Sequence, residues 1–381
     1  MKGIFALALI ALLVIITGCG GGPTIHTGSP IGPFIFMVGQ TSDNIITFKG
    51  SNSGAISPST TASTGHAPSA VTLLGLSTFQ MSLFVTNSAS NTVTVLNLDS
   101  TTGAATPAGI TANTGTNPMD IALRGPVGNG DFGAIYVLNR GSNSISGFRV
   151  TDTAGHLAEL PGSPFATQTN PQALVVTSFG TSSTNITNFV YVANGTLGTI
   201  SGFKINADGS LTELAGSPFA AGTNISALAP RFGGGFLLAS DTGANKVLGF
   251  KFQDTGALTA FTGTGIAAGT QPGRIVFGFN DFVYVVNQGS NNVSGYKFDF
   301  ATTSLTAIAG SPFSAGSNPV TLGFTRSSQL YVANQGSSDV SAYYGYKQRR
   351  ADPNLRLAVP CAGTSQCNAN FVCHECRLSL W

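Results

Sequence analysis

The sequence predicts an all-β fold, a seven-bladed β-propeller. Short apolar runs are separated by Gly, Ser and Asn turns, and this arrangement recurs along the chain. No sustained helical periodicity occurs outside the first 18 residues. The clearest copy of the repeat lies between residues 284 and 313 and has two β-rich runs, a third run and a Pro-Phe corner.

The number of blades follows from anchor residues of the Tyr-Val-x-Asn type. Four-stranded propeller blades are about 40 to 50 residues long. The anchors are spaced 46 to 55 residues apart, so we expect seven equivalent units in a domain spanning residues 34–347. The anchors are Phe36, Phe84, Tyr136, Tyr191, Leu237, Tyr284 and Tyr331.

Each unit has a predicted order of strands. The apolar run before the anchor, such as Pro118–Leu123, is expected to be innermost, and the anchor strand is second. An alternating run such as Ile200–Ile205 is third, since its period of two is typical of a half-buried strand. The outermost strand ends in Gly-Ser-Pro-Phe, which begins at residues 162, 216 and 310.

These motifs resemble the lactonase-like or YVTN β-propeller repeats over about residues 34–344. The resemblance is carried by Tyr136-Val-Leu-Asn and the copies beginning at Tyr191, Tyr284 and Tyr331, each followed by Val/Ile-Ser-Gly/Ala-Phe/Tyr. It implies a seven-bladed propeller. Its enzymatic relatives are propeller-type 6-phosphogluconolactonases and fungal muconate cycloisomerases, and many secreted members have no established activity.

The N-terminal residues 1–18 are expected to be an export signal, with Lys2 followed by the apolar run Ile4–Ile16. Ile16-Thr-Gly-Cys19 resembles the lipobox of bacterial lipoproteins, which implies cleavage before Cys19 and lipid attachment to its sulfur. An ordinary signal peptide is the alternative. Residues 19–33 then form a flexible tether. We therefore expect an exported cell-envelope protein, anchored by lipid to the outer membrane or cell surface.

Composition fits that location. The chain is 42% apolar and only 8% charged, with 49 glycines and a net charge of +2. This balance is typical of an extracytoplasmic β protein, and no basic stripe indicates a nucleic-acid partner. We expect a monomer without a cofactor.

Residues 348–381 depart from the repeat. Cys361, Cys367, Cys373 and Cys376 would bind zinc in one interpretation. The favoured alternative is a frameshift, because the next Gly-Ser-Pro-Phe is due near residue 357, where Arg356–Cys361 can be encoded so that reading one base later spells it. This alternative predicts a disordered tail, no metal site, and an open or weakly closed ring that lacks the innermost strand of the first blade and the outermost strand of the last.

The channel offers few chemical groups. Aligned innermost strands place Ala70, Asp120, Ala173, Ala227, Arg274 and Thr321 in one column. Asp120 and Arg274 would lie across the channel and hold a polar or anionic ligand, or would be isolated groups satisfied by water. His66, on a loop where other units have Thr or Ser, is a candidate general base or a solvated loop residue.

A set of Asn residues is predicted to line one face. Asn favours left-handed turn geometry, so these residues are first of all turn formers, although a ring of amides would also bind sugar hydroxyls or a protein edge. They are Asn87, Asn139, Asn194, Asn287 and Asn334. A glycan or an envelope protein is therefore a candidate partner.

Catalytic relatives place histidine, glutamate and arginine around the channel, whereas Glu159 and Glu213 align here with outer strands. We therefore expect a non-catalytic binding or scaffold module. The alternatives are an extracytoplasmic lactone hydrolase and a decayed gene product without function.

Overall fold

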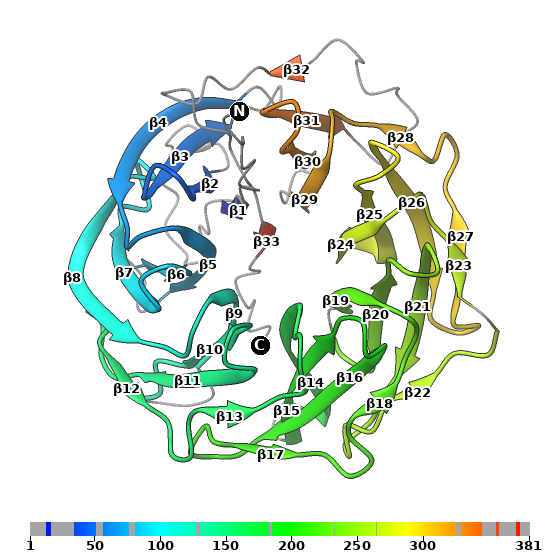
Figure 1. Ribbon diagram of the computed structural model, residues 1–381, viewed down its shortest axis with the longest axis horizontal. Helices are drawn as coiled ribbons and strands as arrows, with labels where there is room; N and C mark the ends of the chain where they lie inside the picture. Colours follow the sequence, from blue (N-terminus) through cyan, green and yellow to red (C-terminus); the bar gives the residue numbers. More distant parts are fainter. Residues whose placement is uncertain are drawn as a thin grey trace, which may run out of the picture.

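A computed structural model describes residues 13–16, 34–50, 56–75, 81–126, 130–182, 185–231, 233–263, 265–324, 329–344, 356–357 and 371–373. These residues form seven sheets, almost entirely antiparallel, arranged around a central axis, which confirms the predicted seven-bladed propeller (Figure 1). The regular secondary structure of the described part consists of strands and one short 3-10 element, η1 (Phe279–Asp281). No helix within these ranges has the length and apolarity needed to cross a membrane.

Blades 1 and 2 have an unbroken outer strand, and blade 7 has two described residues at this position. Blade 1 contains β1 (Leu13–Ile16), β2 (Phe34–Gly39), β3 (Asn44–Gly50) and β4 (Ile56–Ser63). Blade 2 contains β5 (Pro68–Gly75), β6 (Met81–Asn87), β7 (Thr92–Leu98) and β8 (Ala105–Asn113). Blade 7 contains β29 (Pro319–Phe324), β30 (Gln329–Asn334), β31 (Asp339–Tyr344) and β32 (Arg356–Leu357).

The other four blades divide the outer strand into two short pieces that both pair with the third strand. Blade 3 contains β9 (Pro118–Arg124), β10 (Ala134–Asn139), β11 (Ser144–Val150), β12 (Leu157–Glu159) and β13 (Phe165–Ala166). Blade 4 contains β14 (Ala173–Ser182), β15 (Asn185–Asn194), β16 (Thr199–Ile205), β17 (Leu211–Glu213) and β18 (Phe219–Ala220). Blade 5 contains β19 (Ile225–Pro230), β20 (Phe236–Asp241), β21 (Lys246–Lys251), β22 (Thr259–Ala260) and β23 (Ile266–Ala267). Blade 6 contains β24 (Pro272–Phe277), β25 (Phe282–Asn287), β26 (Asn292–Asp299), β27 (Ser304–Ala307) and β28 (Phe313–Ser314).

In blades 3, 4 and 6, the Gly-Ser-Pro-Phe corner lies between the two outer pieces and packs onto a glycine of the third strand. In blade 4, the amide of Gly202 donates a hydrogen bond to Ser217 Oγ at 3.0 Å. A Cβ on Gly202 would lie only 2.9 Å from a ring carbon of Phe219. The same serine contact occurs in blades 3 and 6. The Ser-Gly-Phe and Gly-Ser-Pro-Phe motifs are therefore two halves of one contact.

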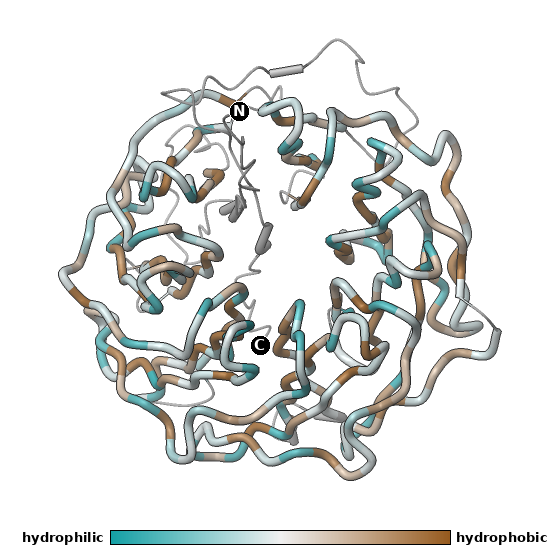
Figure 2. Tube along the Cα trace, viewed as in Figure 1, coloured by the Kyte–Doolittle hydropathy of each residue, from teal (hydrophilic) through white to brown (hydrophobic). Residues whose placement is uncertain are grey.

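The apolar core runs around the ring between neighbouring blades rather than through a single centre (Figure 2). One cluster joins the two ends of the ring and contains Ile35 and Met37 of β2 together with Leu330 and Val332 of β30. Blades 1 and 7 therefore contact each other through side chains, and no described strand of one pairs with a strand of the other.

The repeat supplies no innermost strand for blade 1, and β1 from the N-terminal segment takes the position beside β2 instead. β1 pairs antiparallel with β2, from Leu13 opposite Met37 to Ile16 opposite Phe34. β33 (Phe371–Cys373) pairs parallel with β1. The physical reason is that the edge of a strand presents unpaired backbone groups, and pairing with β1 satisfies those of β2, whose six residues are all buried. β1 lies inside the predicted export signal.

The tail contributes two short pieces to the propeller. β32 pairs with β31 as the outer strand of blade 7, and β33 lies in the sheet of blade 1. Five residues of the tail are described, and the remainder lies outside the described ranges, so the expected disorder of residues 348–381 stays a prediction. Of the four tail cysteines only Cys373 is described, and the described residues contain no cluster of three metal-ligating side chains.

Candidate functional site

The channel column predicted from the sequence occupies equivalent positions in the structure. Ala70, Asp120, Ala173, Ala227 and Thr321 all pair with the residue that precedes the final polar residue of the anchor strand. Arg274 lies in the corresponding irregular stretch of β24, between Pro272 and Ile275. Asp120 and Arg274 are therefore the two charged members of this column, and they lie three blades apart.

The Asp120 carboxylate is buried and accepts hydrogen bonds from the backbone. Its Oδ2 accepts a hydrogen bond from the amide of Leu174 in the next blade at 2.9 Å, and its Oδ1 accepts one from the amide of Ile121 at 3.0 Å. Burial raises the pKa of the Asp120 carboxyl, while the positive charge of Arg274 and these two bonds act to lower it. Asp120 therefore links blades 3 and 4 and also interacts electrostatically with Arg274.

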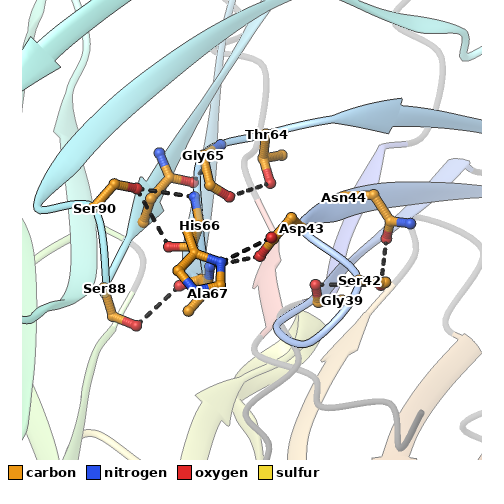
Figure 3. Close-up of polar contacts among 11 residues, drawn as sticks. Gly39, Ser42, Asp43, Asn44, Thr64, Gly65, His66, Ala67, Ser88 and Ser90 are labelled. Atoms are coloured by element: carbon orange, nitrogen blue, oxygen red, sulfur yellow. Dashed lines mark hydrogen bonds and ion pairs between the residues drawn. The ribbon is translucent and has the colours of Figure 1, made fainter.

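His66 lies on the loop between β4 and β5 and has a carboxylate partner that the sequence did not identify. Its Nδ1 lies 2.8 Å from Oδ2 of Asp43, a residue of the β2–β3 turn (Figure 3). The other carboxylate oxygen, Oδ1, accepts the amide of Ala67 at 2.8 Å. The His66 side chain is 71% exposed and that of Asp43 is 41% exposed. The pair thus connects blades 1 and 2 on the face that carries the β2–β3 turn and the β4–β5 loop, which we call the loop face.

The five Asn side chains predicted to line a face are buried, each 0 or 1% exposed. Each side-chain amide donates within its own hairpin, as Asn139 does to Ser144 and Ser146. The oxygen of Asn87 also accepts the amide of Gly65 from the preceding loop at 3.0 Å. Asn87, Asn139, Asn194, Asn287 and Asn334 are each the last residue of their strand and none has a positive φ, so they do not adopt the expected left-handed turn geometry. Their burial also leaves little of each amide exposed to a ligand.

Blade 5 has Asp241 in place of this Asn, and Asp241 was not among the predicted site residues. Its carboxylate is 1% exposed and accepts hydrogen bonds from the hydroxyl of Thr223 and from backbone amides, including that of Asn224. Burial alone would raise the pKa of Asp241, but these hydrogen bonds outweigh it and hold the pKa below its usual range. The substitution of Asp for Asn at the end of an anchor strand was the available signal.

Asp43 could also have been found from the repeat. It follows Ser42 in the hairpin, where other blades have Ser90-Asn91, Ser142-Asn143 and Ser290-Asn291. Cys19, the predicted lipidation residue, lies outside the described residues.

Residues 182–324 match the family model described as Lactonase, 7-bladed beta-propeller. Similar solved structures include a putative 6-phosphogluconolactonase from Bacteroides uniformis, with a TM-score of 0.66 and 16% identity over 86% of this chain and 96% of that one. Another from Bacteroides fragilis has a TM-score of 0.62 and 20% identity over 81% and 85%. The periplasmic gluconolactonase PpgL of Pseudomonas aeruginosa has a TM-score of 0.57 and 16% identity over 79% and 86%.

No curated protein matches the sequence. The family match and the structural neighbours confirm the predicted resemblance to lactonase-like propellers. Identities at this level show the fold alone, since one propeller scaffold serves many functions.

Proposed function

We propose that this chain is an envelope-anchored lactonase-like propeller that acts as a binding or scaffold module, without catalysis in its channel. The observation that supports this most is the use of Asp120. Both of its carboxylate oxygens accept backbone amides, and the bond from Leu174 stabilises the junction of blades 3 and 4. The other aligned column members, apart from Arg274, are alanine or threonine.

The ligand chemistry that suits this channel is polar or anionic. Arg274 supplies a guanidinium, which recognises carboxylates and hydroxyls by directed hydrogen bonds. An uncharged glycan or an envelope protein is an alternative ligand for the loop face. A pull-down from envelope extracts and glycans, repeated with Arg274→Ala, tests this proposal, and a ligand retained equally by both proteins would argue against recognition in the channel.

The proposed anchor is a lipid on Cys19. The segment from residue 19 to residue 33 would reach at most about 50 Å when extended, which would hold the propeller near the membrane. Labelled fatty acid should be incorporated by the full chain expressed in bacteria and not by Cys19→Ser. Incorporation that survives this substitution would exclude Cys19 as the lipidated residue.

An extracytoplasmic lactone hydrolase is the second candidate function. Two of the structural neighbours are named as putative 6-phosphogluconolactonases and a third as a gluconolactonase. The oriented imidazole of His66 is the feature of this chain that favours the candidate. Turnover of sugar lactones by purified protein would support it. A purified chain that fails to fold would instead support a decayed gene product.

A further inference from the structure

The junction between blades 1 and 2 departs from a contact that four other junctions share. In those, an Asn in the turn between the second and third strands accepts a backbone amide of the next blade. The contacts are Asn91 with Asn117 at 2.8 Å, Asn143 with Asn170 at 3.0 Å, Asn245 with Gln271 at 2.8 Å and Asn291 with Asn318 at 2.7 Å. Asp43 makes the same contact to Ala67 through Oδ1, which leaves Oδ2 as an additional acceptor.

His66, which contacts this additional oxygen, also differs from the residues at the equivalent positions of other blades. The amide of His66 donates to Ser90 Oγ at 2.9 Å, in the turn between the second and third strands of blade 2. The amides of Thr116, Thr270 and Ser317 donate to the equivalent serines of blades 3, 6 and 7. His66 thus occupies the position at which these three blades have threonine or serine. At this one junction, Asn is replaced by Asp and the hydroxyl residue by His, and the two new side chains contact each other.

The contact fixes the chemistry of the imidazole. An ionised carboxylate only accepts hydrogen bonds, so Nδ1 of a neutral His66 carries the hydrogen and Nε2 keeps its lone pair. The ring is attached to a braced backbone, since the His66 amide is bound to Ser90 and the Ala67 carbonyl accepts the hydroxyl of Ser88 (Figure 3). The ring is also largely exposed, so water and a substrate can reach it.

We propose that His66 is a general base for hydrolysis of an ester or lactone, and that Asp43 is its positioning residue. This inference rests on the second candidate function, and turnover that depends on His66 would replace the non-catalytic module as the function of this chain. His66 Nε2 removes a proton from water as the water oxygen forms a bond to the carbonyl carbon. The ring C–O bond then breaks, and the imidazolium returns the proton to the departing alkoxide, which yields a hydroxy acid.

A second histidine provides a matched control. His156 Nδ1 lies 2.7 Å from Oδ2 of Asp152, and its side chain is 59% exposed. This pair belongs to a single turn between β11 and β12, where Asp152 also accepts the amides of Ala154 and His156. It reproduces the His–Asp contact without connecting two blades.

The experiment measures acid release from glucono-1,5-lactone, above the spontaneous rate, by wild type, His66→Gln, Asp43→Asn, His156→Gln and Arg274→Ala. His66→Gln should lower kcat by about 100- to 10,000-fold, the usual contribution of a general base. Asp43→Asn should lower kcat with KM unchanged, because the imidazole then favours the wrong tautomer. It should fold normally, because the other junctions already use Asn. His156→Gln should behave as wild type.

Nitrogen NMR of histidine-labelled protein separates positioning from a merely structural role. In the wild type, neutral His66 should carry its proton on Nδ1, and Asp43→Asn should shift the population toward Nε2. Turnover that persists in His66→Gln but is lost in Arg274→Ala would overturn the assignment of His66 and leave the hydrolase function standing. No turnover by the wild type would overturn both.

Discussion

Replacing Gly202 with alanine tests whether the repeated Ser-Gly-Phe motif exists to receive the Pro-Phe corner. The new Cβ would lie 2.9 Å from Leu214 Cδ1, 2.9 Å from Phe219 Cε2 and 3.1 Å from Tyr191 Cε1. These distances are shorter than ordinary van der Waals contacts, and overpacking of this kind costs about 1–3 kcal/mol. The reduced freedom of the unfolded chain returns about 0.5–1 kcal/mol. We therefore expect Gly202→Ala to destabilise the protein by about 1–2 kcal/mol.

Urea denaturation followed by tyrosine fluorescence measures this change. Gly75→Ala is the matched control, because a Cβ at Gly75 meets no described atom within 4 Å and the substitution should be neutral or slightly stabilising. Adding Phe219→Leu to Gly202→Ala should give less than the sum of the two single effects, since the two residues share one contact. Equal denaturation midpoints for Gly202→Ala and Gly75→Ala would refute the steric explanation of the motif.

Three further predictions follow from other contacts. Tyr136→Phe should destabilise the protein by about 1–3 kcal/mol in the same urea assay, since the Tyr136 hydroxyl donates to the Gly209 carbonyl of the next blade at 2.7 Å and its loss leaves that oxygen without this partner. The hydrogen bonds of Asp241 lower its pKa in the folded protein, so they stabilise the fold above the unfolded pKa of about 3.9 and this contribution is lost as pH falls through the folded pKa. Asp241→Asn should therefore be less stable at pH 7 and lose less stability on acidification, and parallel pH curves for both proteins would contradict this. A chain that begins at residue 19 lacks β1, so hydrogen exchange should be faster in β2 than in β30, the equivalent strand of blade 7.

The repeat made much of the fold predictable. The anchor strands, their seven-fold recurrence and the equivalence of the channel column were all readable from aligned copies, because each blade repeats the same local strand and turn chemistry. Asp120 and Arg274 were identified in this way, as exceptions in an otherwise plain column.

The partners of the predicted residues could not be read from the same alignment. The oxygens of Asp120 bind Leu174 of the next blade, and His66 contacts Asp43 across 23 positions of the chain. These contacts arise between copies of the repeat, whereas alignment compares copies position by position. The burial of the Asn side chains was hidden for a related reason, since the loop that covers Asn87 arrives from the preceding outer strand.

By itself, the sequence determined the strand pattern, the number of blades and the Ser-Gly-Phe and Gly-Ser-Pro-Phe motifs, because turn geometry and strand alternation are local properties. Only the tertiary structure decided which apolar run fills the innermost position of blade 1 and which carboxylate meets His66. Closing a ring brings residues from different blades together, and the free energy of pairing an unoccupied strand edge or a buried carboxylate depends on what that closure places beside it.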